Sequence, residues 1–298
     1  MTATVPARAG LAGAWSPYLP ILLGLGALYV PVFVELWNGL WQTEEQGHAP
    51  LILAAAAWVF YTLQDRAAQA RSKPSRISGG LTLAAGLVLY ALGRVLDIVL
   101  LELGSLPVVV SATLAFLYGW RTVWVFRFPL LFVLFALPLP GFIVDALTAP
   151  LKLWVSVLAE TTLYAAGYPI ARSGVSLTLG QYQMLVADAC SGLNSMFSLM
   201  ATGIFYVYLA GRKNKLQNAL LVAAIPVVAF FANVIRVIII CLVTYYFGDE
   251  AGQGFVHGAA GMVLFAVSLV LLFALDLILD WLFRHRRSST LPMGANPR

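Results

Sequence analysis

Three side chains capable of acyl-transfer chemistry lie in late, apolar parts of the chain: Cys190, Arg236 and His257. A thiolate can attack a carbonyl carbon, and an imidazole can carry the protons that the reaction moves. A guanidinium can stabilise the oxyanion of a tetrahedral intermediate. We therefore interpret these residues as a candidate catalytic set, provided that the fold brings them to one depth.

Cys190 stands in VADACSGLNSM (186–196), where polar and small residues precede an apolar run. Asp188 is a good N-cap, so we expect Cys190 in the first turn of a helix. The positive end of the helix dipole favours a thiolate there, whereas apolar burial opposes it. A nearby guanidinium would lower the pKa of the thiol. Ser191, Gly192 and Asn194 are candidates for supporting the thiol or binding substrate.

Arg236 interrupts a long apolar run, with Asn233 three residues earlier on the same helical face. A charge inside a membrane span costs about 2.5–3.5 kcal/mol on insertion scales, which makes Arg236 a functional candidate. It lies eleven residues before Phe247, about 16 Å along the axis, and so toward the outer surface. The alternatives are pairing with an acid or extension of the side chain toward the interface.

We expect His257 at the outer end of the last apolar segment, where Gly254, Gly258 and Gly261 allow close helix packing. His48, in the first external loop, is a rival proton carrier or a substrate-binding group. We favour His257 because a helix start fixes geometry better than a loop. The three histidines are far apart without ligand spacing, so we expect no metal and no other cofactor.

Other polar or reactive residues have structural interpretations. Cys241 lies five positions after Arg236 and is turned about 140° from it, so we expect it to pack in the core. Arg94 and Asp97, three residues apart, are predicted to form a mutual ion pair. A multi-span transporter that uses Arg94, Asp97 and Arg236 is an alternative to the acyl-transfer interpretation.

The composition identifies the elements that must position these residues. Hydrophobic residues make up 61% of the 298 residues and charged residues only 10%, which excludes an ordinary soluble domain. Since a helix needs about 20 residues to cross a bilayer, we predict an all-α polytopic membrane protein. About eight segments qualify: 17–37, 50–64, 79–101, 105–120, 128–147, 188–210, 216–247 and 255–283.

The basic residues predict the orientation. Fourteen of the 18 Lys and Arg fall at the N-terminus or in alternate loops, which must therefore be cytoplasmic. They are Arg8, Arg66, Arg71, Lys73, Arg76, Arg121, Arg127, Arg212, Lys213, Lys215, Arg284, Arg286, Arg287 and Arg298. Both termini are then cytoplasmic, and the net charge of +5 reports topology rather than nucleic-acid binding.

The stretch 138–187 is predicted to lie outside without a full span. It contains an amphipathic helix of about four turns beginning near Pro150, and a short β-hairpin around Gly180-Gln181 before the sixth span. We divide the chain into a cytoplasmic segment 1–16, one integral membrane domain 17–283 and a basic cytoplasmic tail 284–298.

These motifs resemble the exosortase family of bacterial membrane enzymes, which also includes the archaeosortases. The resemblance rests on ACSGL (189–193), NVIR (233–236) and FVHGAAG (255–261), in this order on late spans. FPLLFVLFALPLP (128–140) and GHAPL (47–51) are similar to further family features. The resemblance extends over most of residues 47–283.

The resemblance implies Cys190 as nucleophile, Arg236 as oxyanion or substrate stabiliser and His257 as general acid and base. It implies substrates that are exported proteins with a C-terminal sorting motif, such as Pro-Glu-Pro, followed by one transmembrane helix and a basic end. It also implies a bacterial inner membrane, an active site facing the periplasm and an association with exopolysaccharide. A non-catalytic exopolysaccharide-assembly factor, in which Cys190 only packs, is a further alternative.

Overall fold

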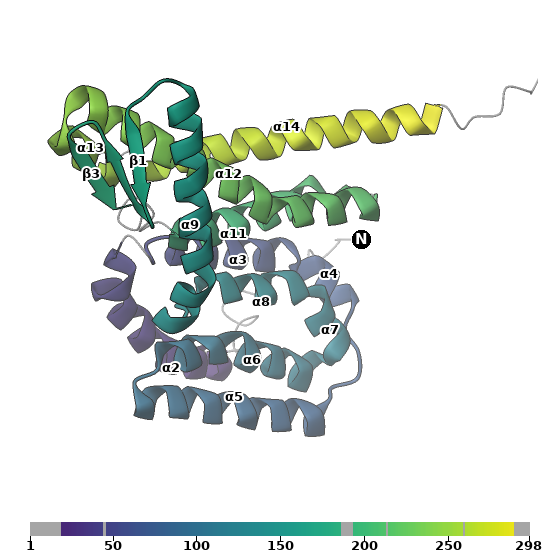
Figure 1. Cartoon of the computed structure of the whole chain (residues 1–298). Helices are drawn as coiled ribbons and strands as arrows, with labels where there is room; N and C mark the ends of the chain where they lie inside the picture. The colour runs from purple at the N-terminus through teal and green to yellow at the C-terminus, as the bar shows by residue number, and fades with distance from the viewer. Residues whose placement is uncertain (1–18, 44–45, 186–192, 213, 259, 289–298) are drawn as a thin grey trace, which may run out of the picture. The chain divides into compact units, whose positions relative to one another are not determined.

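The computed structural model describes residues 19–43, 46–185, 193–212, 214–258 and 260–288. The described chain is mostly helical and divides into two compact units, Met1–Pro138 and Leu139–Arg298 (Figure 1). The predicted boundaries of one membrane domain between a short N-terminal segment and a basic tail stay a prediction.

The first unit is entirely helical in its described part. Its elements are α2 (Leu19–Asn38), η2 (Leu40–Gln42), α3 (Ala49–Thr62), α4 (Gln64–Gln69), α5 (Arg76–Leu96), α6 (Val99–Tyr118), α7 (Trp120–Val125), α8 (Arg127–Phe132) and η3 (Val133–Ala136).

The second unit combines long helices with a small sheet. Its elements are α9 (Gly141–Ala165), β1 (Ile170–Ser173), β2 (Ser176–Leu179), β3 (Tyr182–Leu185), α11 (Leu193–Ala210), α12 (Lys215–Phe247), α13 (Asp249–Gly258) and α14 (Ala260–Ser288).

Within the described residues, five helical segments are long and apolar enough to cross a membrane: Leu19–Asn38, Arg76–Leu96, Val99–Tyr118, Lys215–Phe247 and Ala266–Phe283. Three shorter apolar helices, Ala49–Thr62, Arg127–Ala136 and Phe197–Ala210, coincide with other predicted segments. The predicted multi-span helical class is therefore confirmed, while the count of eight spans and the cytoplasmic termini stay predictions.

The predicted segment 128–147 is not one helix. α8 and η3 end at Ala136, and α9 begins at Gly141. Pro138 and Pro140 lie between them, and a proline disfavours helical backbone at the residue before it. The helix therefore stops where the apolar composition alone indicated a continuous span.

The predicted ion pair between Arg94 and Asp97 is wrong. The guanidinium of Arg94 donates to both carboxylate oxygens of Glu35, at 2.6 and 2.7 Å, and to Glu102 at 3.2 Å. Asp97 is the left-handed C-cap of α5, with φ of 55°, so the helix has ended before its side chain could face Arg94. Arg94 thus joins α5 to α2 and α6.

α5 and α6 pack through glycines spaced seven residues apart. Gly79, Gly86 and Gly93 are buried on one face of α5. A Cβ on Gly93 would lie 2.5 Å from the backbone nitrogen of Glu102, and one on Gly79 would lie 2.7 Å from that of Phe116. Such distances leave no room for a side chain, so the glycines set how closely the two helices approach.

The three strands form an antiparallel sheet in the order β1-β2-β3. The predicted hairpin around Gly180-Gln181 is confirmed, since Leu179 pairs with Tyr182 and Gly180 has φ of 59°. β1 was not predicted. Its Ile170 pairs with Leu179, so the strand returns the chain from α9 to the sheet.

α9 is longer than predicted, because it begins at Gly141 and contains Pro150 within it. Its buried residues Val155, Ala159 and Leu163 recur every four positions and pack with the sheet in one apolar core. Arg172 of β1 donates to Glu160 at 2.8 Å. The sheet is therefore attached to α9 by both apolar packing and an ion pair.

The α5–α6 contact generates a stability prediction. Replacing Gly93→Ala forces a Cβ against backbone that cannot rotate away, and we expect a loss of about 1–3 kcal/mol of unfolding free energy. The matched control is Gly80→Ala, whose Cβ would meet only a ring atom of Phe116 at 4.0 Å. Thermal unfolding of both variants in detergent measures the difference. Equal unfolding midpoints would contradict this account of the packing.

Candidate active site along helix α12

α12 is the helix around which the second unit packs. It contacts α9, α11, α13, α14 and the sheet. Its buried residues recur at intervals of three and four, which is the pattern of one helical face. Toward its C-terminal end, these are Ala229, Ala232, Asn233, Val234, Arg236, Val237, Ile240, Cys241 and Thr244.

Arg236 belongs to this buried face rather than to a lipid-facing one. The residue is only 4% exposed, and Asn233, one turn earlier, is 1% exposed. The alternative in which the arginine extends out to the interface therefore does not describe the structure. A charge held inside a span at this depth is expensive, and such residues usually serve binding or catalysis.

α11 packs antiparallel to α12, and the close contact at Gly203 shows which part of α11 lies beside which part of α12. A Cβ on Gly203 would lie 2.9 Å from the side chain of Ile225, and Leu199 shares the apolar core with Ala229. Both helices rise 1.5 Å per residue and run in opposite directions. Ten residues back from Gly203 along α11 therefore correspond to ten residues forward from Ile225 along α12, which places Leu193 level with about residue 235. The first described residue after 186–192 thus lies at the height of Arg236.

α13 and α14 together run back along α12 after a turn at Gly248, where φ is 91°. A Cβ on Gly252 would lie 3.1 Å from the Cβ of Thr244, so α13 lies directly against α12. Further along, Ser268 borders the same small cavity as Val228. The approach of Gly252 to Thr244 gives an antiparallel register that brings residue 257 level with about residue 239 of α12, and the shared cavity agrees with it.

His257 differs from its predicted place. We expected it at the start of the last span, but it lies in the final turn of α13, a separate helix that ends at Gly258 before α14 begins at Ala260. Its height is about 5 Å along the axis from that of Arg236. Figure 1 shows α13 and the strands at the same end of this unit.

The other predicted site residues divide into two groups. Asp188, Cys190, Ser191 and Gly192 lie outside the described residues, and Asn194 is the second residue of α11. His48 is the half-buried N-cap residue of α3, and it makes no side-chain capping bond there. His48 belongs to the first compact unit, so its part in the site stays a prediction.

Cys241 is buried, with 1% exposure, among Val237, Ile240 and the apolar residues of α9 and the sheet. This environment agrees with the packing role predicted for it. Because Cys241 belongs to the apolar core, its substitution can serve as a control for substitution of Cys190, the other cysteine of the chain.

A polar cluster that the sequence analysis missed lies at the other end of α12. Arg212 forms ion pairs with Asp276 and, at 3.1 Å, with Asp280 of α14, and Tyr206 of α11 donates to Asp276 at 2.6 Å. Burial alone would lower the pKa of Arg212, but the hydrogen bond and charge of Asp276 raise it. The signal in the sequence was Asp276, an acid inside an apolar run.

The described residues thus define a multi-span helical membrane protein whose second unit buries an arginine level with the ends of two neighbouring helices. A family model described as transmembrane exosortase (Exosortase_EpsH) matches residues 40–274. The chain therefore belongs to the transmembrane exosortase family. It has no match among the curated proteins or the solved structures that were compared.

The contact between α12 and α13 can be tested by adding one methyl group. Gly252→Ala places a Cβ against Thr244 and should lower the unfolding free energy by about 1–3 kcal/mol. Gly254→Ala is the matched control, because a Cβ there would meet nothing within 4 Å. Thermal unfolding of the purified chain measures both. If Gly252→Ala were as stable as Gly254→Ala, the close packing of α13 would be refuted.

Proposed function

We propose that this exosortase-family protein is a membrane-embedded cysteine protease or transpeptidase of the bacterial inner membrane. It cleaves the C-terminal sorting signals of exported proteins at the periplasmic face. Its catalytic residues are Cys190, Arg236 and His257. The substrates carry a short motif of the Pro-Glu-Pro kind, one transmembrane helix and a basic end.

The observation that carries this proposal is that the start of α11, the end of α13 and Arg236 lie at nearly the same position along the axis of α12. Arg236 is buried there, residue 257 of α13 is about 5 Å away along the axis, and α11 begins at the same level. Cys190 precedes Leu193 by three residues, so chain length alone holds their Cα atoms within about 11 Å. The packing of the second unit therefore supports a shared site.

The proposed reaction uses each group once per half-reaction. The thiolate of Cys190 attacks the carbonyl carbon near the sorting motif, and Arg236 stabilises the resulting oxyanion. The C–N bond breaks, and His257 gives a proton to the leaving amine, which departs with the tail helix. Water or an acceptor amine then attacks the thioester carbonyl while His257 takes its proton. The C–S bond breaks, which restores the Cys190 thiolate and the protonated imidazole.

The positive-inside pattern supports the orientation. Basic residues in alternate loops favour a cytoplasmic start for α12, which directs its Arg236 half toward the periplasm. A substrate tail with a basic end is held in the same orientation by the same rule. Its motif, on the other side of its helix, then emerges at the periplasmic surface.

The nucleophile is tested by co-expression with a tailed substrate from the same genome, followed by an immunoblot for the tail. We expect Cys190→Ala to abolish removal of the tail while the protein remains in the membrane. Cys241→Ala, the matched control, removes a core sulfur and should retain processing. A Cys190→Ala variant that still processed the tail would overturn the proposal and favour a transporter or a non-catalytic assembly factor.

The role of the guanidinium is tested by Arg236→Lys, which keeps the charge but loses the planar fork of donors. Loss of an oxyanion donor lowers the turnover of comparable sites by about 10²–10³-fold, and we expect a similar fall in the processing rate. The control Gln217→Leu changes another buried polar residue of α12, about 28 Å away along the axis, and should process normally. Undiminished processing by Arg236→Lys would exclude the oxyanion role.

A further inference from the structure

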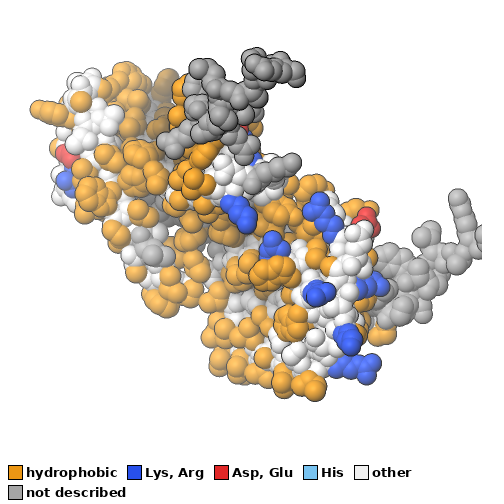
Figure 2. All heavy atoms as spheres, turned by 90° about the vertical axis from the view of Figure 1, so that its right-hand side faces the viewer, with side chains coloured by type: hydrophobic (Ala, Val, Ile, Leu, Met, Phe, Trp, Pro, Cys, Tyr) orange, Lys and Arg blue, Asp and Glu red, His pale blue; other side chains and the backbone are white. Residues whose placement is uncertain are grey.

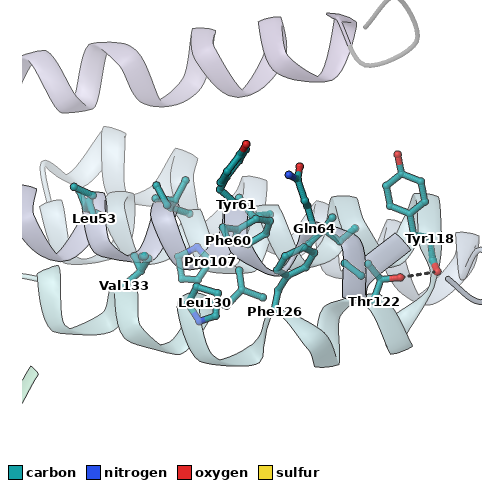
Figure 3. A pocket seen from close by; sticks show the side chains of 18 of the residues that line it. Leu53, Phe60, Tyr61, Gln64, Pro107, Tyr118, Thr122, Phe126, Leu130 and Val133 are labelled. Atoms are coloured by element: carbon teal, nitrogen blue, oxygen red, sulfur yellow. Dashed lines mark hydrogen bonds between the residues drawn. The ribbon is translucent and has the colours of Figure 1, made fainter. Parts of the chain in front are cut away.

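The first unit contains an open apolar groove that the proposed chemistry does not use. The groove has a volume of about 910 Å³ and runs between α3, α4, α6, α7 and α8. This volume falls within the range of ligand-binding pockets. Figure 3 shows its length, from Leu53 near one end to Tyr118 at the other.

The walls of the groove are almost entirely apolar over most of this length. Leu53, Ala57 and Phe60 line it from α3, and Pro107 and Val110 line it from α6. The ring of Phe60 on α3 stacks on that of Phe126, the residue between α7 and α8, with centroids 3.8 Å apart, and both rings line the groove. These side chains provide no hydrogen-bonding groups for a polar ligand.

One end of the groove is polar and basic. Gln64, Arg71, Tyr118 and Thr122 line it there, and the guanidinium of Arg71 lies 4.5 Å from the ring centroid of Tyr118. The hydroxyl of Thr122 donates to the carbonyl of Tyr118 at 3.2 Å, so it is already engaged (Figure 3). The guanidinium of Arg71 therefore offers charged donors at this end, beside the amide of Gln64.

Further cations surround this end of the groove. Arg66, Lys73 and Arg76 are exposed on the same connection between α3 and α5. Figure 2 looks onto the side on which α4 and α7 lie in Figure 1, and Lys and Arg side chains are among those exposed there. The groove thus has an apolar body and a positively charged mouth.

We propose that this groove binds a phospholipid with an anionic headgroup, whose acyl chain lies along α3 and whose phosphate meets Arg71. Basic sites between transmembrane helices on the cytoplasmic side are suited to anionic headgroups. A guanidinium can donate two parallel hydrogen bonds to two phosphate oxygens. Arg71 is therefore suited to bind the phosphate of the lipid at the mouth of the groove. The proposal is independent of the cysteine chemistry.

The dimensions fit one leaflet of the bilayer. From Pro50 to Gln64 the groove follows α3 to the start of α4 over fourteen residue steps, about 21 Å at 1.5 Å per residue. Half of a hydrocarbon core of about 30 Å is about 15 Å. An acyl chain of ordinary length can therefore lie within the groove while its headgroup remains at the level of Arg71.

Charge also decides against the other apolar occupant that a membrane offers, the tail helix of a sorting signal. Such a tail carries basic residues at its cytoplasmic end, which would meet the basic mouth of the groove. Like charges brought together in this way repel, whereas an anionic headgroup is attracted. The mouth therefore selects a lipid over the proposed substrate's tail.

Binding is tested on the delipidated full chain by native mass spectrometry, with phosphatidylglycerol and phosphatidylcholine as probes. We expect one phosphatidylglycerol to bind more tightly than phosphatidylcholine. Arg71→Ala should weaken its binding about fivefold, the size expected for one basic residue near an anionic surface. Arg66→Ala removes a cation of the same connection that does not line the groove, so it should weaken binding less than Arg71→Ala does.

A second pair of variants tests the groove itself and does not depend on charge. Ala57→Trp fills the groove at an exposed position and should abolish the tight binding, whereas Ala85→Trp makes the same change on the exposed face of α5 and should not. Unchanged binding by Ala57→Trp would overturn the site. If inorganic phosphate displaced the lipid, the site would bind phosphate rather than a lipid. If a synthetic apolar helix with a basic end displaced it, the site would bind a sorting tail.

Discussion

The burial of one guanidinium in α12 is the constraint on which the second unit depends. A charge that is 4% exposed inside an apolar helix is unfavourable unless polar groups of neighbouring segments pair or hydrogen-bond with it, so those segments must pack close to it. α11 and α13 approach α12 at glycines, Gly203 and Gly252, where even one methyl group would clash. Because glycine permits this approach, the ends of both helices come to the height of the arginine, and the candidate site is a consequence of close packing.

The first unit follows a related principle with a different result. Its buried glycines on α5 bring the backbones of α5 and α6 together, and Arg94 then joins two carboxylates from α2 and α6. The side of the unit formed by α3, α6 and α8 is instead left open as an apolar groove. The unit therefore has a closely packed side, formed by α5 and α6, and a side that is open to an apolar ligand, formed by α3, α6 and α8.

Local patterns were enough to predict some elements but not others. Gly180-Gln181 between two β-rich arms predicted the hairpin, and the apolar run bounded by Lys215 and Gly248 predicted α12 almost to the residue. The partner of Arg94 could not be found in this way, because Glu35 lies 59 positions away and only the tertiary fold brings it near. β1 was missed for the same reason, since IARS has no strand pattern of its own and pairs only through the sheet.

Among the candidate site residues, the place of Arg236 within one long helix was predictable from the apolar run, whereas its orientation toward the protein interior was not. His257 was assigned to a helix start because the sequence shows no break between it and the following apolar residues. The length of α12 has one more implication. From Lys215 to Arg236 the helix rises about 32 Å, close to the thickness of a hydrocarbon core of about 30 Å. If the proposed function holds, the length of α12 would also limit the substrates: only a tail helix of matching length, anchored by its basic end, would present its scissile bond at the arginine.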